Sequence, residues 1–258
     1  MNTFKRLLGL GLVVALVLPI RPAYASEQRS ANFMAGYDLD STSLTFCRVT
    51  GADGSPFGAG IHNGDRISTS GSSTTTSEVS DTDPFDLLAV NDIIEVHLGN
   101  GAPLTRVIAV RTSASAVVVD SAWDLTSTPG FVFRWWDTAC GTAATDGWID
   151  VAGWDKFTIT FLLEQVNATG GIDVQVQCRL PGLIQAPVQV FPSCTTGACN
   201  TYQNYTTAGI ASATTIVADE PWSECRVGVK INSADDGGDL TTNAERITST
   251  LLLEKATR

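Results

Sequence analysis

Two segments of the chain alternate between apolar and polar residues, and each has a cysteine on its apolar side. In 172–180 every second residue is apolar or is Cys178, and in 225–231 the same pattern begins at Cys225. Successive side chains of a β-strand point to opposite faces, so this period of two predicts two half-buried strands. Both sulfur atoms then face one core, and we expect them to form a disulfide bond.

The other four cysteines extend this cross-linking. Six cysteines in total, an even number, are typical of the disulfides of exported proteins. Cys194 and Cys199 bracket only Thr-Thr-Gly-Ala, a loop short enough to close on itself. This leaves Cys47 to pair with Cys140. A zinc site is not expected, because the cysteines lack two-residue spacings and partnering histidines.

The first 25 residues have the pattern of a signal peptide. Lys5 and Arg6 precede an apolar run from Leu7 to Leu18, and Ala23-Tyr-Ala25 supplies the small residues that a signal peptidase reads. Twelve helical residues rise about 18 Å, too little for a hydrocarbon core of about 30 Å. We expect cleavage and a secreted, extracellular or cell-surface protein without membrane insertion; the alternative is an uncleaved anchor.

The charge balance is acidic. The chain has 16 basic and 27 acidic residues and a formal net charge of −11 at pH 7. The leader removes Lys5, Arg6 and Arg21, so the mature part is more acidic still. Such a surface repels nucleic-acid backbones and anionic lipid. Nucleic acid is therefore not expected as a partner. The expected partners are further copies of the chain, other surface proteins or glycans.

Strand signals recur along the mature part, and helix signals are nearly absent. Only 84–90 has the character of a helical turn, and the Ser/Thr/Gly-rich segment 70–77 is expected to be a loop. The chain is therefore predicted to be all-β. The expected strands are 43–49, 66–69, 92–98, 104–112, 116–120, 130–136, 156–166, 172–180, 188–191, 213–218, 224–231 and 246–254.

The second half of the chain has the longer strands. The apolar positions of 157–163 supply one wall of a core and those of 172–180 supply another, which is typical of two packed antiparallel sheets. A β-sandwich is therefore predicted there. The small, polar segment 140–147 separates it from the first half, so we place a domain boundary after residue 140.

A family resemblance agrees with this division. The stretch Pro84-Phe-Asp-Leu-Leu-Ala-Val-Asn-Asp-Ile-Ile94, with the strand from Leu104, resembles the small barrel modules of tailed-phage structural proteins. The half from Gly147 to Leu253 resembles the jelly-roll modules that accompany them. After the expected signal peptide (1–25), the resemblance implies a small β-barrel-like domain (26–140) and a jelly-roll-like antiparallel β-sandwich (141–258). It also implies a building block for assemblies or adhesion, with no catalytic residues.

Residues that suit catalysis are few. The chain has two histidines, His62 and His97, and neither has a Ser or Cys nucleophile in a recognisable context. His97 shares the outward phase of a predicted strand with Glu95, so both histidines are interpreted as solvated. No strand carries two or three alternating carboxylates as a sandwich glycosidase would. The chain is predicted not to be an enzyme.

Two groups of residues are candidates for ligand binding. Asp235, Asp236 and Asp239 cluster on a turn between two strands, where their carboxylates suit calcium, although Asp and Gly are also ordinary turn residues. No other cofactor is expected. Trp148 and Trp154 are candidates for stacking on a sugar ring, and burial in a core is the alternative. The adjacent Trp135 and Trp136 should point to opposite faces of a strand, which exposes one of them.

These observations favour a non-catalytic structural or adhesion protein that self-associates as a subunit of an extracellular assembly. One alternative is a lectin-like carbohydrate-binding module, and a second is a virion-type structural protein. Asn167 and Asn204 each begin an N-glycosylation sequon, and the sequence does not show whether the secreting cell uses them.

The leader leads to a direct prediction. Material recovered from outside the producing cell should begin at Ser26, because the peptidase cuts after the small residue Ala25. N-terminal sequencing or intact-mass measurement checks this. A start at Met1 in that material would contradict it.

Overall fold

The computed structural model describes residues 26–62, 66–70, 73–78, 85, 87–97, 103–123, 131–166, 170–180, 187–193, 201–217, 222–232 and 245–256. Every regular element in these ranges is a β-strand, and every strand pair is antiparallel. The predicted helical turn at 84–90 is wrong for its described part, where residues 85 and 87–90 form turns and coil. Within the same ranges, no helix has the length and hydropathy needed to cross a membrane.

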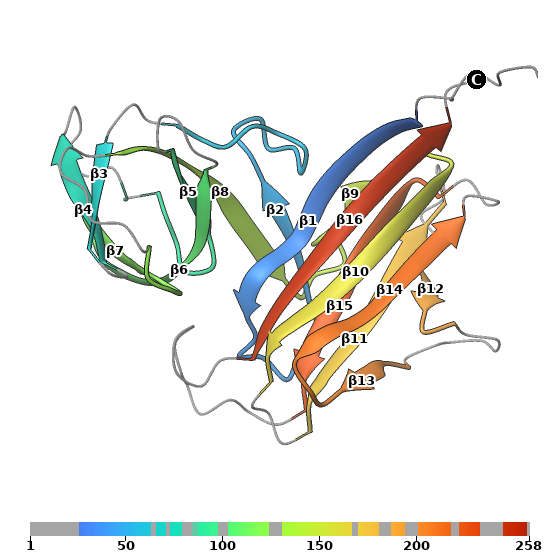
Figure 1. Cartoon of the computed structure of the whole chain (residues 1–258). Helices are drawn as coiled ribbons and strands as arrows, with labels where there is room; N and C mark the ends of the chain where they lie inside the picture. Colours follow the sequence, from blue (N-terminus) through green and yellow to red (C-terminus); the bar gives the residue numbers. More distant parts are fainter. Residues whose placement is uncertain are drawn as a thin grey trace, which may run out of the picture.

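Two facing sheets form a sandwich (Figure 1). One has the order β1-β16-β10-β14, and the other contains the order β12-β11-β15-β2. The short β9 and β13 pair with β15 and β11. Their bounds are β1 Ser26–Asp38, β2 Thr45–Thr50, β9 Ile149–Asp150, β10 Lys156–Gln165, β11 Ile172–Arg179, β12 Val188–Phe191, β13 Gln203–Tyr205, β14 Gly209–Val217, β15 Glu224–Ile231 and β16 Arg246–Ala256.

The sandwich core follows the period-two pattern of its strands. β11 and β15 pair in register from Ile172↔Ile231 to Arg179↔Glu224, which places Cys178 opposite Cys225. The two cysteines are fully buried and joined by the predicted disulfide. On the facing sheet, alternate residues of β10 close the core. They are Phe157, Ile159, Phe161 and Leu163.

Six further strands form a second unit with its own core. Their pairing order is β8-β3-β4-β7-β6-β5, and β5 pairs with β8 again, so we call this unit the ring. The β3–β8 pairing that completes the circuit covers only Arg66↔Val132 and Ile67↔Phe131. The ring's buried side chains include Phe85, Trp123, Phe133 and Trp135. Its strands are β3 Arg66–Ser70, β4 Ser73–Glu78, β5 Ile93–His97, β6 Leu104–Ser113, β7 Ala116–Val119 and β8 Phe131–Gly141.

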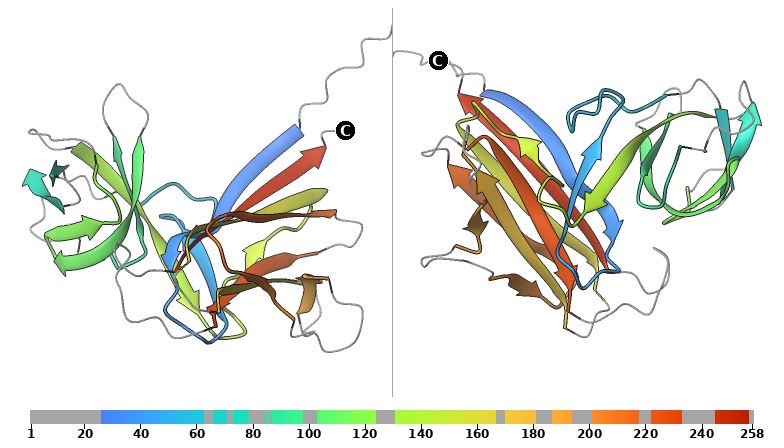
Figure 2. Two further views of the ribbon diagram at one scale, coloured as in Figure 1. Left: turned by 60° about the horizontal axis from the view of Figure 1, so that its bottom comes forward. Right: turned by 180° about the vertical axis from the view of Figure 1, so that it is seen from behind.

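Strand β8 belongs to both units (Figure 2). Its residues 132–136 pair with β5 in the ring, and 137–141 pair with β2 in the sandwich. The predicted disulfide Cys47–Cys140 joins directly opposite residues of β2 and β8. A second close approach occurs at Gly36 of β1, which has φ 61° and where a Cβ would lie 2.9 Å from Val107 Cγ2. The ring is thus fixed to the sandwich by backbone pairing and a covalent bond.

The structure also differs from the sequence-based expectations in several strands and in the domain boundary. β1 and the short β9 and β13 were not predicted, and β4 occupies most of the 70–77 segment that was expected to be a loop. The boundary after residue 140 does not separate the sheets, because β1 pairs with β16 and β2 pairs with β15. The ring is therefore an insertion between two strands of the sandwich. The expected Cys194–Cys199 pair lies outside the described residues.

The two disulfides should contribute strongly to stability. They link residues 93 and 47 positions apart, and constraint of the unfolded chain by loops of this size is worth about 4 kcal/mol each. We expect the double variant Cys178→Ala/Cys225→Ala, and separately Cys47→Ala/Cys140→Ala, to lose free energy of unfolding by about this amount in urea titrations. The control is Cys194→Ala/Cys199→Ala, which removes the bond expected from the sequence alone. It should lose about 2 kcal/mol, because the loop that this expected bond closes is much shorter. Equal losses in all three variants would contradict the loop argument.

Candidate functional site

A cleft of about 310 Å³ lies where the sandwich meets the ring. β1 and β16 form one side, β5, β6 and β8 form the other, and the loop 51–60 after β2 covers one end. The volume is at the lower end of the range for small-molecule sites. The side chains that give the cleft its chemistry are Ser30, Asn32, Phe57, Glu95, Thr105, Trp136 and Thr250.

The ring side of the cleft contains a buried carboxylate with two cationic or polar partners. Glu95 is 7% exposed, and its Oε1 accepts a hydrogen bond from Arg134 Nε at 2.6 Å. His97 Nε2 lies 2.8 Å from the same oxygen. β5 and β8 bring these residues together because Glu95 and Arg134 are directly opposite in the register. The arginine neutralises the carboxylate, so this wall is polar without a strong negative charge.

Trp136 forms the aromatic part of the same wall. The Arg134 guanidinium lies 5.1 Å from the ring centroid of Trp136, and the indole Nε1 donates to the carbonyl oxygen of Gly58 at 3.3 Å. The alternation along β8 explains why Trp136 reaches the cleft, since the preceding Trp135 is 2% exposed in the core of the ring. The prediction that these two indoles point to opposite faces is confirmed.

The sandwich side of the cleft is lined by neutral polar groups. The Thr250 hydroxyl donates to Asn32 Oδ1 at 3.1 Å, and the two residues are paired in the β1–β16 register. This bond is accepted by the amide oxygen of Asn32, whose Nδ2 is a hydrogen-bond donor. Ser30, two residues earlier on β1, adds a hydroxyl on the same side.

A second cleft of about 340 Å³ adjoins the first, because Pro56 and Phe57 line both. It contains Trp154, one of the two predicted sugar-stacking residues, together with Asp150. The Arg29 guanidinium lies 5.9 Å from the Phe57 ring centroid and 6.0 Å from that of Trp154. An arginine from β1 therefore contacts two aromatic rings at this cleft.

Trp148, the other predicted sugar-stacking residue, is not placed to bind a ligand. It is 6% exposed, and the guanidinium groups of Arg179 and Arg226 lie 4.4 and 4.5 Å from its ring centroid. Its Nε1 donates to the carbonyl oxygen of Ala144 at 2.8 Å. The indole is thus buried against two arginines, and burial was the alternative expected for it from the sequence.

Arg226 acts as a structural cation in that cluster. It is 4% exposed, and its Nη1 donates to the carbonyl oxygens of Ala143, Ala144 and Asp146 at 3.2 Å each. Its guanidinium also lies 3.5 Å from the ring centroid of Phe46. Desolvation lowers the pKa of Arg226 to about 10, with the neighbouring Arg179 as the next cause. The group fixes the turn between β8 and β9.

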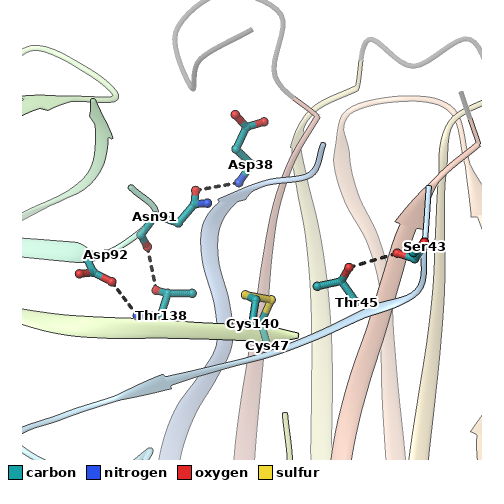
Figure 3. Close-up of a disulfide and its surroundings, with 8 residues drawn as sticks. All are labelled: Asp38, Ser43, Thr45, Cys47, Asn91, Asp92, Thr138 and Cys140. Carbon is teal, nitrogen blue, oxygen red and sulfur yellow. Dashed lines mark hydrogen bonds between the residues drawn. A yellow bond between two sulfur atoms is a disulfide. The ribbon is translucent and has the colours of Figure 1, made fainter. Parts of the chain in front are cut away.

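A second buried charge lies at the junction of the two units, near the Cys47–Cys140 disulfide (Figure 3). The two oxygens of Asp92 accept from the backbone nitrogens of Ala89 and Thr138 at 2.8 Å each. The neighbouring Asn91 accepts from the Asp38 nitrogen at 3.0 Å through Oδ1. Burial raises the pKa of Asp92 to about 6, although the two backbone hydrogen bonds oppose this shift.

Several predicted site residues lie outside the described residues. They are the calcium candidates Asp235, Asp236 and Asp239, the cysteines Cys194 and Cys199, and the sequon residue Asn167. Among the described residues, no group of three or more His, Cys, Asp or Glu is placed to hold a metal ion. The amide nitrogen of the second sequon residue, Asn204, donates to Gly170 and Asp173 at 2.8 Å each.

Comparisons of the chain with protein-family models, curated proteins and solved structures find no match. The site is therefore interpreted from its own residues. Its composition of two tryptophans, a neutralised carboxylate and several neutral polar groups suits the binding of a polar, uncharged ligand better than acid–base chemistry.

Asp92 gives the protein a defined pH dependence. Its pKa is about 6 in the folded state and 3.8 as an ordinary carboxyl, so between these values the folded protein binds more protons than the unfolded chain. Its contribution to the free energy of unfolding should therefore fall as the pH rises from about 4 to about 6, by on the order of 3 kcal/mol.

Urea titrations of the wild type and Asp92→Asn between pH 4 and 7 measure this. The stability of the wild type relative to the variant should decline across the interval, because the variant lacks the titrating group. The exposed Asp40→Asn serves as the control and should run parallel to the wild type. A constant difference between wild type and Asp92→Asn would contradict the assignment.

Proposed function

We propose that the mature protein is a non-catalytic structural or adhesion protein, secreted or held at the cell surface, that works as a subunit of an extracellular assembly. The observation that carries the proposal is the order of the strands in the sandwich. Supporting observations are the two disulfides, the acidic composition and the unpaired strand edges on one side of the sandwich.

The sandwich strands follow the order of a jelly roll. With the ring and the short β9 and β13 set aside, eight strands remain in chain order from β1 to β16. One sheet then contains the first, last, third and sixth strands, and the other contains the second, seventh, fourth and fifth. Two interlocked Greek keys produce this order, which capsid and lectin domains share. We interpret the sandwich as jelly-roll-like and the ring as a barrel-like insertion.

The two disulfides indicate an oxidising compartment. This agrees with the leader and supports a place outside the cytoplasm. The contact of Glu95 with Arg134 compensates the charge of this buried carboxylate, which supports a structural role for it. Rigid, cross-linked units with a net negative charge suit a component that is exposed to the extracellular medium.

The side of the sandwich away from the ring offers edges for self-association (Figure 1). β14 ends one sheet and β12 ends the other, so each has one edge without a neighbouring strand among the described residues. Unpaired edges are templates for strand addition by another chain. Val188 on β12 is 47% exposed, which places an apolar side chain at this edge.

The proposal predicts a concentration-dependent oligomer. Light scattering on the mature protein should give a mass above that of one chain at high concentration, and electron microscopy should show filaments, shells or small closed particles. The variant Val188→Lys should shift the protein toward the monomer, because a charge at the edge opposes strand addition. The matched control is Leu87→Lys in the ring, where the leucine is 71% exposed, and it should leave the mass unchanged. A strict monomer at high concentration, with and without calcium, would refute the assembly.

A further inference from the structure

We propose that the two adjoining clefts form one groove that binds an uncharged oligosaccharide. The groove consists of both clefts, which share Pro56 and Phe57. Trp136 lines the first cleft and Trp154 lines the second. The inference rests on the proposed adhesion function and names its partner class, a neutral glycan. The sequence pointed to Trp154 and to one of the adjacent Trp135 and Trp136.

The first support is the distribution of aromatic rings. Each cleft contains one indole, Trp136 or Trp154, and the Phe57 ring lines both clefts. The face of a pyranose ring that carries C–H groups is apolar, and flat aromatic side chains supply a matching surface. Three aromatic residues along two adjoining clefts suit a chain of several sugar residues better than a single small molecule.

The second support is the character of the polar groups. Ser30, Asn32, Thr105 and Thr250 line the first cleft with hydroxyl and amide groups. Such groups both donate and accept hydrogen bonds, as sugar hydroxyls do. The Thr250 hydroxyl donates to Asn32 Oδ1 and so orients the amide of Asn32 at the cleft. The neutral groups come from both units, so the site is complete only when sandwich and ring are joined.

The third support is the balance of charge. Glu95 is compensated by Arg134 in the first cleft, and the second cleft contains both Arg29 and Asp150. Arg29 also lies 3.8 Å from Glu27. Neither cleft presents a net positive set of side chains, and the whole chain is acidic. An anionic polysaccharide would therefore be repelled, and an uncharged one would not.

The fourth support is the rigidity of the groove. Trp136 is held by its hydrogen bond to Gly58 and by the guanidinium of Arg134. The disulfide Cys47–Cys140 and the shared strand β8 hold the two sides of the first cleft in place. A site that is already ordered loses little conformational entropy on binding, so modest contacts are sufficient for measurable affinity.

The test is isothermal titration of the full mature protein with uncharged hexasaccharides of glucose, mannose, galactose and N-acetylglucosamine. At least one should bind with a dissociation constant in the micromolar to millimolar range. Trp136→Ala and Trp154→Ala should each weaken that binding by about tenfold or more, and Asn32→Ala should weaken it by a smaller factor. Leu87→Ala, an exposed apolar residue outside the groove, is the control and should bind as the wild type does.

Circular dichroism melting accompanies each variant, and Trp136→Phe replaces Trp136→Ala if the latter does not fold. Absence of binding to all four hexasaccharides, or binding that neither tryptophan variant weakens, would overturn the proposal. Tighter binding of a hexauronate than of every uncharged chain would overturn it as well.

The same samples separate this proposal from the assembly. An oligomer that binds no sugar refutes the groove alone, whereas a monomer that binds sugar refutes the assembly alone. Val188→Lys, which should disrupt the oligomer, should leave the affinity of the groove for sugar unchanged.

Discussion

The structure depends on one strand that is hydrogen-bonded in two units at once. β8 pairs with β5 over 132–136 and with β2 over 137–141, so its backbone fixes the ring against the sandwich. The period of two along the strand then assigns the side chains: Trp135 enters the core of the ring and Trp136 enters the cleft. The disulfide at Cys140 holds the far end. Without this strand, the ring side and the sandwich side of the groove would have no fixed position relative to each other.

The parts of the fold that sequence could predict are those in which local pattern and burial agree. The alternation in β11 and β15 predicted both strands and the Cys178–Cys225 bond. Each strand has one apolar face, and burial of both faces in one core leaves a single register in which the sulfur atoms meet. β1 was missed because two register shifts, between Asn32 and Met34 and between Met34 and Tyr37, break its alternation. β4 was missed because its Ser and Thr residues are typical of loops, and only its pairing with β3 and β7 makes it a strand.

The candidate site was predictable only in fragments. The adjacency of two tryptophans on one strand indicated that one of Trp135 and Trp136 would leave the core. The shared phase of Glu95 and His97 placed them on one face, where His97 Nε2 lies 2.8 Å from Glu95 Oε1. Nothing in the sequence indicates that Arg29 contacts Phe57. Arg29 lies on an edge strand and Phe57 lies in a loop, and only tertiary packing brings the two together. Burial was an alternative for Trp148, but the arginines of β11 and β15 that pack against it could not be read from its local sequence.

The pairing of β1 with β16 has a consequence for how the chain reaches its folded state. Ser26 of β1 lies opposite Ala256 of β16, so β1 has no partner strand until β16 has been synthesised and released. The ring, whose strands run from residue 66 to 141, consists of nearer neighbours in sequence and therefore closes shorter loops. We expect the ring to fold early and the sandwich to assemble around it last. The pairing of β1 with β16 therefore makes completion of the sandwich a late step of folding.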